Sequence, residues 1–225
     1  MREPSEGACL IDDIDREDAE VHAPALGAPR PWPVILVNGL PGAGKTTLAR
    51  TLARSMRLPL LSKDTIKEAH ADVLGAEPPP GWSQRDWNAA LGTAASRTMW
   101  ALLADAPGGA LLDSCWPGDV RHLVVRGLQR ARSRLPAEIW CEAPLTIARR
   151  RFEARHPRHP IHGELPTDAE WERWQAAAQP LQIGPTLRVD TTDPVDASAI
   201  IAWISQQVQA GRREPGPGAT SDDPA

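Results

Sequence analysis

Short apolar runs alternate along the chain with longer stretches in which apolar residues recur at helical spacing. Five runs have the length and composition of buried parallel strands, at about 33–38, 58–62, 110–113, 137–141 and 186–190. Helical periodicity fills the intervals, at about 45–57, 63–74, 83–105, 120–134, 144–155, 168–179 and 197–208. Because such alternation forms right-handed crossovers, it predicts an α/β fold with a five-stranded parallel sheet between two helical layers.

The longest predicted helix, 83–105, carries a single apolar stripe. The stripe consists of Trp87, Leu91, Ala95, Met99 and Leu102. Trp87 is therefore expected to pack in the core. Trp82, just before this helix, is the better candidate to stack on a ring or sugar of a bound molecule.

The stretch Gly-Leu-Pro-Gly-Ala-Gly-Lys-Thr at 39–46 matches the phosphate-binding pattern G-x-x-x-x-G-K-[ST] at every fixed position. It lies between the first apolar run and a helical stretch, which is the context that the motif requires. Glycines let the backbone turn its N–H groups inward into an anion-binding concavity, and the start of the helix adds more of them. The alternative, a glycine-rich turn with a chance lysine, is disfavoured by these flanks.

The motif implies a role for each of its residues. Lys45 is expected to reach the β- and γ-phosphates of a nucleotide, and the Thr46 hydroxyl is expected to ligate Mg²⁺. The guanine signature Asn-Lys-x-Asp is absent from the sequence, so ATP is favoured over GTP. The predicted nucleotide-binding residues are Gly39, Leu40, Pro41, Gly42, Ala43, Gly44, Lys45, Thr46 and Thr47.

Two carboxylates follow predicted strands. Asp64 comes after the second strand, where it is placed to orient a hydroxyl acceptor and accept its proton; the alternative role is a helix N-cap. Asp113 ends the third strand, where an acid can hold Mg²⁺ or its water ligands; the alternative is a turn-forming aspartate. Ligands of parallel sheets bind beyond the carboxyl ends of the strands, so both acids are expected on the rim that carries the phosphate-binding loop.

A basic segment follows the fourth predicted strand and is interpreted as a lid at about 149–166. Arg151 and Arg155 share a helical face, and arginines that close over phosphates would stabilise the charge of phosphoryl transfer. A solvated basic face is the alternative. The segment's three histidines are His156, His159 and His162. A metal site there is disfavoured because the intervening Pro157 and Pro160 deny these side chains a common helical face; a polar loop that contacts substrate is preferred.

Composition narrows the function further. The 225 residues carry a net charge of −4, which gives no support for nucleic acid as an obligatory partner. Cys9, Cys115 and Cys141 lie far apart, which suits a reducing cytoplasm and argues against a disulfide framework. No apolar run approaches the roughly 18 residues that span a membrane, and the acidic start is unlike a signal peptide.

We expect a disordered acidic leader at 1–31, a single domain at 32–210 and a disordered tail at 211–225. The expected oligomeric state is a monomer or a homodimer.

In order, the motifs are Gly39–Thr47, Lys63-Asp64-Thr65-Ile66-Lys67-Glu68, Leu111-Leu112-Asp113-Ser114 and the Arg-rich 149–158 segment. This order resembles the P-loop kinase-like family of small phosphotransferases, which includes chloramphenicol phosphotransferase and the kinase domains of polynucleotide kinase and zeta toxins. The resemblance covers about 33–210. It implies a P-loop NTPase three-layer sandwich with an adenylate-kinase-like core, Mg-ATP as donor, Asp64 as the activating aspartate and lid arginines on the donor phosphates. Lys67 stands where arginine is frequent in such proteins.

These observations favour an ATP-dependent phosphotransferase that moves the γ-phosphate to a hydroxyl of a small molecule, such as an antibiotic, a nucleoside or a sugar. Two alternatives stay open. A polynucleotide 5′-hydroxyl kinase would require a basic acceptor channel, against which the acidic balance counts. A non-catalytic ATP-binding regulatory module would bind nucleotide without acceptor-stimulated turnover.

Overall fold

The computed structural model describes residues 33–133, 136–155 and 158–213 of the chain. The predicted leader at 1–31 and residues 214–225 of the predicted tail lie outside the described residues, as do His156 and Pro157. Residues 211–213, predicted as part of the tail, belong instead to the last helix. Disorder of the leader and tail therefore stays a prediction.

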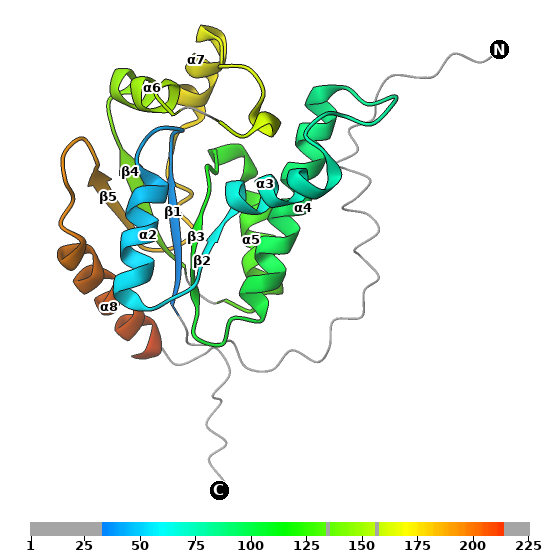
Figure 1. Ribbon diagram of the computed structural model, residues 1–225. Helices are drawn as coiled ribbons and strands as arrows, with labels where there is room; N and C mark the ends of the chain where they lie inside the picture. Colours follow the sequence, from blue (N-terminus) through cyan, green and yellow to red (C-terminus); the bar gives the residue numbers. More distant parts are fainter. Residues whose placement is uncertain (1–32, 134–135, 156–157, 214–225) are drawn as a thin grey trace, which may run out of the picture.

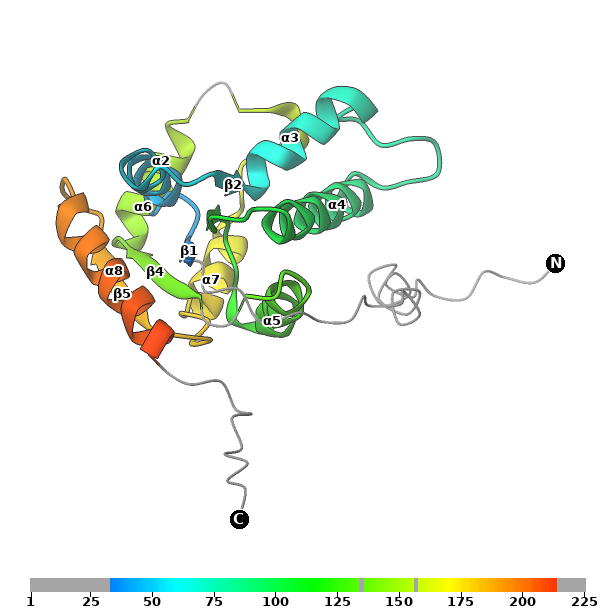
Figure 2. The same ribbon diagram turned by 90° about the horizontal axis from the view of Figure 1, so that it is seen from below.

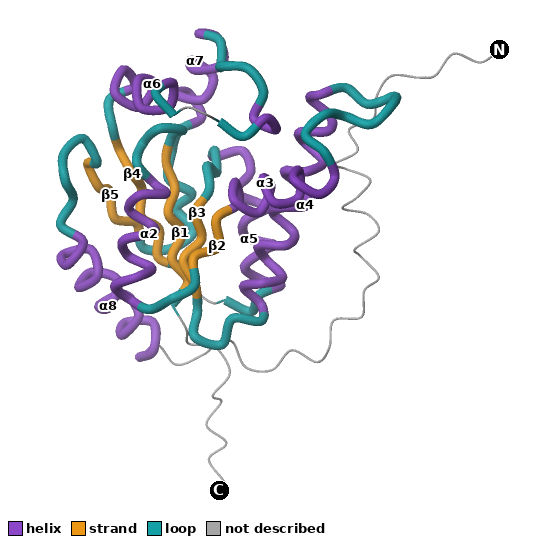
Figure 3. The backbone as a smooth tube through the Cα atoms, in the orientation of Figure 1, coloured by secondary structure: helices purple, strands orange, loops and turns teal. Residues whose placement is uncertain are grey.

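Five parallel strands form one sheet in the order β2-β3-β1-β4-β5 (Figures 1 and 3). The strands are β1 (Val34–Gly39), β2 (Leu60–Ser62), β3 (Ala110–Asp113), β4 (Ala137–Glu142) and β5 (Thr186–Asp190). The phosphate-binding strand β1 lies at the centre, with Ile35 paired to Leu111 of β3 and to Ala137 of β4. The predicted five-stranded parallel α/β fold is confirmed.

Alternate residues of the sheet face two helical layers, which Figure 2 shows from below. Ile35 and Val37 pack with α2 (Lys45–Met56) and α8 (Ala197–Arg213) on one face. Val34 and Leu36 pack with α4 (Gln84–Ala104) and α5 (Arg121–Arg130) on the other. Both faces of β1 are thus buried, which explains why its sequence is a continuous apolar run.

Three more helices and a short turn gather at the carboxyl ends of the strands (Figure 1). They are α3 (Lys63–Leu74), α6 (Leu145–Glu153), α7 (Asp168–Ala177) and the 3₁₀ turn η3 (Pro160–His162). A small apolar cluster of Ala71, Leu91 and Ile161 joins α3, α4 and η3. The segment predicted as a lid is therefore packed on the core at this point.

Several sequence predictions need correction. In α4 the buried residues are Leu91, Ala95, Met99 and Leu103, whereas Leu102 is exposed. Leu91 packs with α3 and η3, whereas Met99 and Leu103 pack against the sheet, so the buried face shifts along the helix. Near its end Leu103 takes the buried position, and Leu102 is rotated from Leu103 by about 100°. Strand β2 is shorter than predicted, and α5 ends at Arg130 rather than near residue 134. No helix in the described part of the chain is long and apolar enough to cross a bilayer.

Candidate active site

The loop between β1 and α2 forms a cradle of backbone amides. Gly42 and Gly44 have φ angles of 79° and 77°, in the left-handed region that favours glycine. The N-cap residue of α2 is Gly44, so no side chain caps the first amides of the helix. Lys45 is 9% exposed, and its Nζ donates to the Leu40 carbonyl oxygen at 2.8 Å, across the loop. Uncapped amides beside a buried ammonium fit the phosphate groups of a nucleotide.

Neighbouring backbone holds this loop in place. A Cβ added to Gly39 would lie 2.5 Å from the Cys141 carbonyl oxygen at the end of β4. A Cβ at Gly42 would lie 2.0 Å from the carbonyl oxygen of Ala148 in α6. Only glycine fits either position, so the loop rests directly on the strand and on the helix that begins the lid.

Asp113 lies at the end of β3 and is 3% exposed. Its Oδ2 accepts a hydrogen bond from the Ser62 hydroxyl at 3.2 Å, while its Oδ1 is buried without a hydrogen-bond partner among the described residues. Burial raises the pKa of this carboxyl, and the Thr46 hydroxyl and the Lys45 ammonium oppose the rise. Mg²⁺ prefers oxygen ligands. The buried Oδ1 of Asp113, which has no hydrogen-bond partner in the described part of the chain, and the nearby Thr46 hydroxyl are ligands of this kind.

Asp64 lies in the first turn of α3, whose N-cap residue is Ser62. The alternative in which Asp64 is the N-cap is therefore wrong. The carboxylate is exposed and close enough to Lys67, Asp113 and Arg158 to influence the pKa of each. The pKa of Lys67 is lowered, chiefly by burial and against the pull of Asp64. Charges from α3, β3 and the lid thus converge on one point.

That point is a polar cavity of about 370 Å³, here called the carboxylate pocket. The loop between β1 and α2 forms its floor, and the lid and the starts of α3 and α4 form its walls. It is lined by Pro41, Gly42, Gly44, Lys45, Thr46, Asp64, Lys67, Asn88, Asp113, Ser114, Cys115, Phe152, Arg155, Arg158, His162, Glu164, Pro166, Glu170 and Trp174. The pocket brings together Lys45, Thr46, Asp64 and Asp113, as the sequence predicted.

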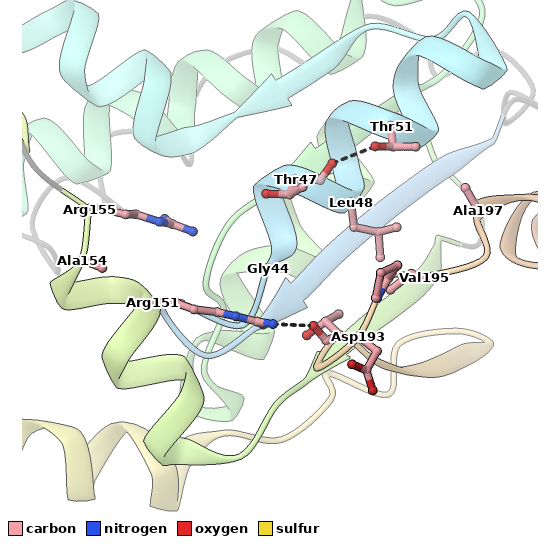
Figure 4. A pocket seen from close by; sticks show the side chains of 13 residues that line it. Gly44, Thr47, Leu48, Thr51, Arg151, Ala154, Arg155, Asp193, Val195 and Ala197 are labelled. Carbon is pink, nitrogen blue, oxygen red and sulfur yellow. Dashed lines mark hydrogen bonds between the residues drawn. The ribbon is translucent and has the colours of Figure 1, made fainter.

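A second cavity of about 490 Å³, here called the side pocket, lies between the start of α2, the end of α6 and the chain that follows β5 (Figure 4). It is lined by Gly42, Gly44, Thr47, Leu48, Thr51, Arg151, Ala154, Arg155, Thr191, Asp193, Pro194, Val195 and Ala197. Arg151 Nη2 donates to the carbonyl oxygens of Thr191 and Thr192 at 3.0 and 2.9 Å. Arg155 lines both pockets and extends toward the start of α2 (Figure 4).

The remaining lid arginines have separate positions. Arg149 pairs with Glu153 and Asp168 on the surface. Helix α6 ends at Glu153, so Arg155 lies beyond the helix, and the prediction that Arg151 and Arg155 share a helical face is wrong. Arg158 lies further along the same loop. Its guanidinium lies 4.4 Å from the centre of the Phe152 ring, in the wall of the carboxylate pocket. Burial lowers the pKa of Arg158, and the nearby Arg155 adds to this effect.

The lid loop is tied to α3 by two histidines. His159 Nε2 lies 3.0 Å from Asp72 Oδ1, and His162 Nε2 lies 2.7 Å from Glu68 Oε1. The two imidazoles thus contact different carboxylates. His162 also lines the carboxylate pocket. Contact of this loop with substrate stays a prediction.

The tryptophan that lines this site is not the one that the sequence suggested. Trp82 packs edge-on against Trp87 and does not line the carboxylate pocket, whereas Trp174 of α7 does. Trp87 packs beside the cluster at the junction of α3 and α4, as predicted. The sequence feature that could have identified Trp174 is its spacing from Trp171, because the two tryptophans form an aromatic face on the helix that follows the basic segment. Asn88 was also missed; its Oδ1 is buried without a hydrogen-bond partner among the described residues.

A protein-family model described as an AAA domain matches residues 34–181, which include the loop, both carboxylates and the lid. The chain belongs to this family. A protein of Chloroflexus aurantiacus, described as a kinase without a stated substrate, is 32% identical to the chain. The match covers 79% of this chain and 99% of that one, with a TM-score of 0.68. The P-loop kinase-like family indicated by the sequence motifs is thereby confirmed, and ATP binding and phosphotransfer are its associated properties.

More distant matches add little beyond the fold. APS kinase from Mycobacterium tuberculosis, solved with AMPPNP and APS, has a TM-score of 0.52 and 19% identity over 79% of this chain and 99% of its own. Cytidylate kinases of Pyrobaculum arsenaticum and Pyrobaculum neutrophilum are 43% and 46% identical over 44 residues. That segment is 20% of this chain and 24% of each cytidylate kinase, so the match spans about a quarter of their length.

Proposed function

We propose that this P-loop kinase transfers the γ-phosphate of ATP to a hydroxyl group of a small molecule. The observation that carries the proposal is that the phosphate-binding loop lines two cavities. Gly42, Gly44 and Arg155 line both the side pocket and the carboxylate pocket. A nucleotide in one cavity and an acceptor in the other would meet at this loop.

The side pocket suits the nucleoside part of ATP. Leu48, Val195 and Ala197 supply apolar surface, and Thr191 Oγ1 donates to the Ala43 carbonyl oxygen at 2.9 Å, which fixes one wall to the loop. Bound there, ATP would direct its phosphates over the amides of residues 39–47 toward Lys45. The relative solved with AMPPNP supports nucleotide use by this fold.

Thr46 and Asp113 are the residues that would hold Mg²⁺. The unpartnered Oδ1 of Asp113 and the nearby Thr46 hydroxyl provide hard oxygen donors at the phosphate end of the cradle. The ion would neutralise charge on the phosphates. Since burial raises the pKa of Asp113, a neighbouring positive charge would favour its ionised form.

Asp64 is the proposed general base. Its exposed carboxylate lines the carboxylate pocket, where it can accept the proton of an acceptor hydroxyl beside the γ-phosphate. Arg155 is placed to stabilise the charge of the group in transfer because it lines both cavities. Arg151 is bound to the Thr191 and Thr192 carbonyl oxygens, so its proposed contribution is to the donor side.

The Asp64→Asn variant tests the assignment of the base. We expect acceptor-stimulated ADP release to fall at least about 100-fold, while calorimetric binding of AMPPNP with Mg²⁺ is unchanged. Asp105→Asn is a matched control because it makes the same change at an exposed residue after α4. Equal transfer rates for Asp64→Asn and the wild type, over a panel of hydroxylated compounds, would remove Asp64 from this role.

A further inference from the structure

A third cavity adjoins the carboxylate pocket and plays no part in the reaction proposed so far. It has a volume of about 260 Å³ and lies beneath the start of the phosphate-binding loop. We call it the aromatic annex. Its lining includes Leu40, Pro41, Trp116, Trp140, Trp174 and Ala178. Pro41, Cys115 and Trp174 line both cavities, so the annex opens beside the candidate acceptor site rather than at a separate place on the surface.

The lining of the annex is mostly apolar, and apart from the indole N–H groups of its tryptophans it offers a ligand few hydrogen bonds. Its one polar amide side chain belongs to Asn38, which is fully buried and fully engaged. Asn38 Oδ1 accepts from the backbone N–H groups of Gly39 and Trp116, at 2.8 and 2.9 Å. Asn38 Nδ2 donates to the Trp116 carbonyl oxygen and to Glu138 Oε1, each at 3.0 Å. A sugar-like ligand, which has many hydroxyl groups, would therefore lose most of its hydration there with little replacement.

The same hydrogen bonds hold the cavity open. Trp116 is fixed through both its N–H and its carbonyl by Asn38, and its ring stacks on Trp100 with centroids 6.4 Å apart. Glu138 also accepts from the backbone N–H groups of Leu181 and Gln182, which anchors the chain that follows α7. The buried network thus holds the Trp116 wall of the annex directly and also holds the chain shortly after Ala178, so both are ordered by the same hydrogen bonds.

Size and chemistry together define the occupant. A dry apolar cavity of about 150 Å³ is enough to admit a benzene ring, and the annex exceeds that volume. The rings of Trp116, Trp140 and Trp174 favour contact with another planar apolar group. We infer that the annex binds a ring-sized apolar group of the acceptor, whose hydroxyl then lies in the carboxylate pocket. The acceptor is accordingly an amphipathic alcohol rather than a polyol; this inference rests on the proposed kinase function.

The test uses two probes that differ only in the ring: 3-phenylpropane-1,2-diol and propane-1,2-diol. Binding of each to the full chain is measured by ligand-observed NMR and calorimetry, in the presence of AMPPNP and Mg²⁺. We expect the phenyl compound to bind at least about tenfold more tightly because its ring is removed from water. Ala178→Phe, which places a ring in the annex, should weaken phenyl binding at least about tenfold. Ala176→Phe, two residues away on an exposed position of α7, should leave it unchanged.

The outcomes separate the two proposals. Equal affinities of the two diols, no binding of either at millimolar concentration, or equal effects of the two phenylalanine variants would overturn the annex assignment. AMPPNP titrations of the same samples check the donor site independently, and Ala178→Phe must retain wild-type AMPPNP affinity to count as folded. Absence of AMPPNP binding to the wild type would instead contradict the kinase proposal, whichever diol binds.

Discussion

Glu138 shows how much of this molecule depends on single buried residues. It is 1% exposed, and its two oxygens accept from four donors: Asn38 Nδ2, the N–H groups of Leu181 and Gln182, and the Thr186 hydroxyl. Every donor comes from a segment that shapes the site or the sheet beside it. A carboxylate can satisfy all of them because it accepts on both oxygens.

Glu138→Gln is expected to lower the free energy of unfolding by about 1–3 kcal/mol, since one oxygen becomes an NH₂ group that faces one backbone N–H and one side-chain donor. Urea titration monitored by circular dichroism measures the change. Glu142→Gln, on the same strand, removes only a surface pair with Arg188 and should cost less than about 1 kcal/mol. Similar losses in the two variants would show that the buried network does not carry this stability.

Residues of the site differ in how well the sequence predicted them. Lys45, Thr46, Asp64 and Asp113 were predicted because their roles follow from a local motif or from the end of a strand. Asn38 and Trp174 were not predicted, because their roles depend on contacts with segments far away in the sequence. Asn38, for example, is hydrogen-bonded to Glu138, which lies 100 residues further along the chain. Hydrophobic periodicity indicates which face of a helix or strand is buried, but it does not identify the residues of other elements that pack against that face.

At the scale of the elements, α4 and α5 approach each other at Gly127. A Cβ at this position would lie 2.3 Å from the Trp100 ring, which in turn stacks on Trp116 of the annex. Gly92, in α4, makes a matched comparison because a Cβ there would have no neighbour within 4 Å among the described residues. The packing of α4 against α5 therefore requires a glycine at position 127 but not at position 92.

Gly127→Ala should reduce the free energy of unfolding by about 1–3 kcal/mol through overpacking. Gly92→Ala should instead raise it by about 0.5–1 kcal/mol, because alanine is the better helix former. Urea titrations of both variants give the comparison. Stabilisation by both substitutions would mean that α5 shifts without cost, and that the contact with Trp100 does not set the distance between the helices.

The ends of the elements were harder to predict than their order. The apolar runs indicated each strand, yet β2 starts at Leu60 and α6 stops at Glu153, short of the predicted limits. Arg57 is the C-cap of α2 and has a φ of 54°, a left-handed conformation that the pattern of apolar and polar residues does not predict. Helix ends depend on backbone turns and on the loops beyond them, whereas the order of strands and helices follows from the alternation of two periods.

At the scale of the whole molecule, the site is assembled from both halves of the chain around one loop. Nucleotide binding should therefore stabilise the entire domain. With Mg²⁺ and AMPPNP at 100 times the dissociation constant, the expected gain is about 2.7 kcal/mol. Thermal unfolding of the wild type with and without the nucleotide measures this effect.

Lys45→Ala is expected to abolish most of that stabilisation at the same nucleotide concentration, because the phosphates lose the ammonium beside the cradle. Arg54→Ala, at an exposed position in the last turn of α2, is the control and should respond to nucleotide like the wild type. A full thermal shift in Lys45→Ala would contradict the proposed mode of phosphate binding.

The close approach of Gly42 to the Ala148 backbone restricts where relatives of this chain can gain or lose residues. One residue inserted between β4 and Ala148 would turn α6 by roughly 100° and remove its fit to the loop. Insertions after Glu153 would leave that junction intact. Length variation among homologues should accordingly concentrate on the far side of α6, where new acceptors can be accommodated without rebuilding the ATP cradle.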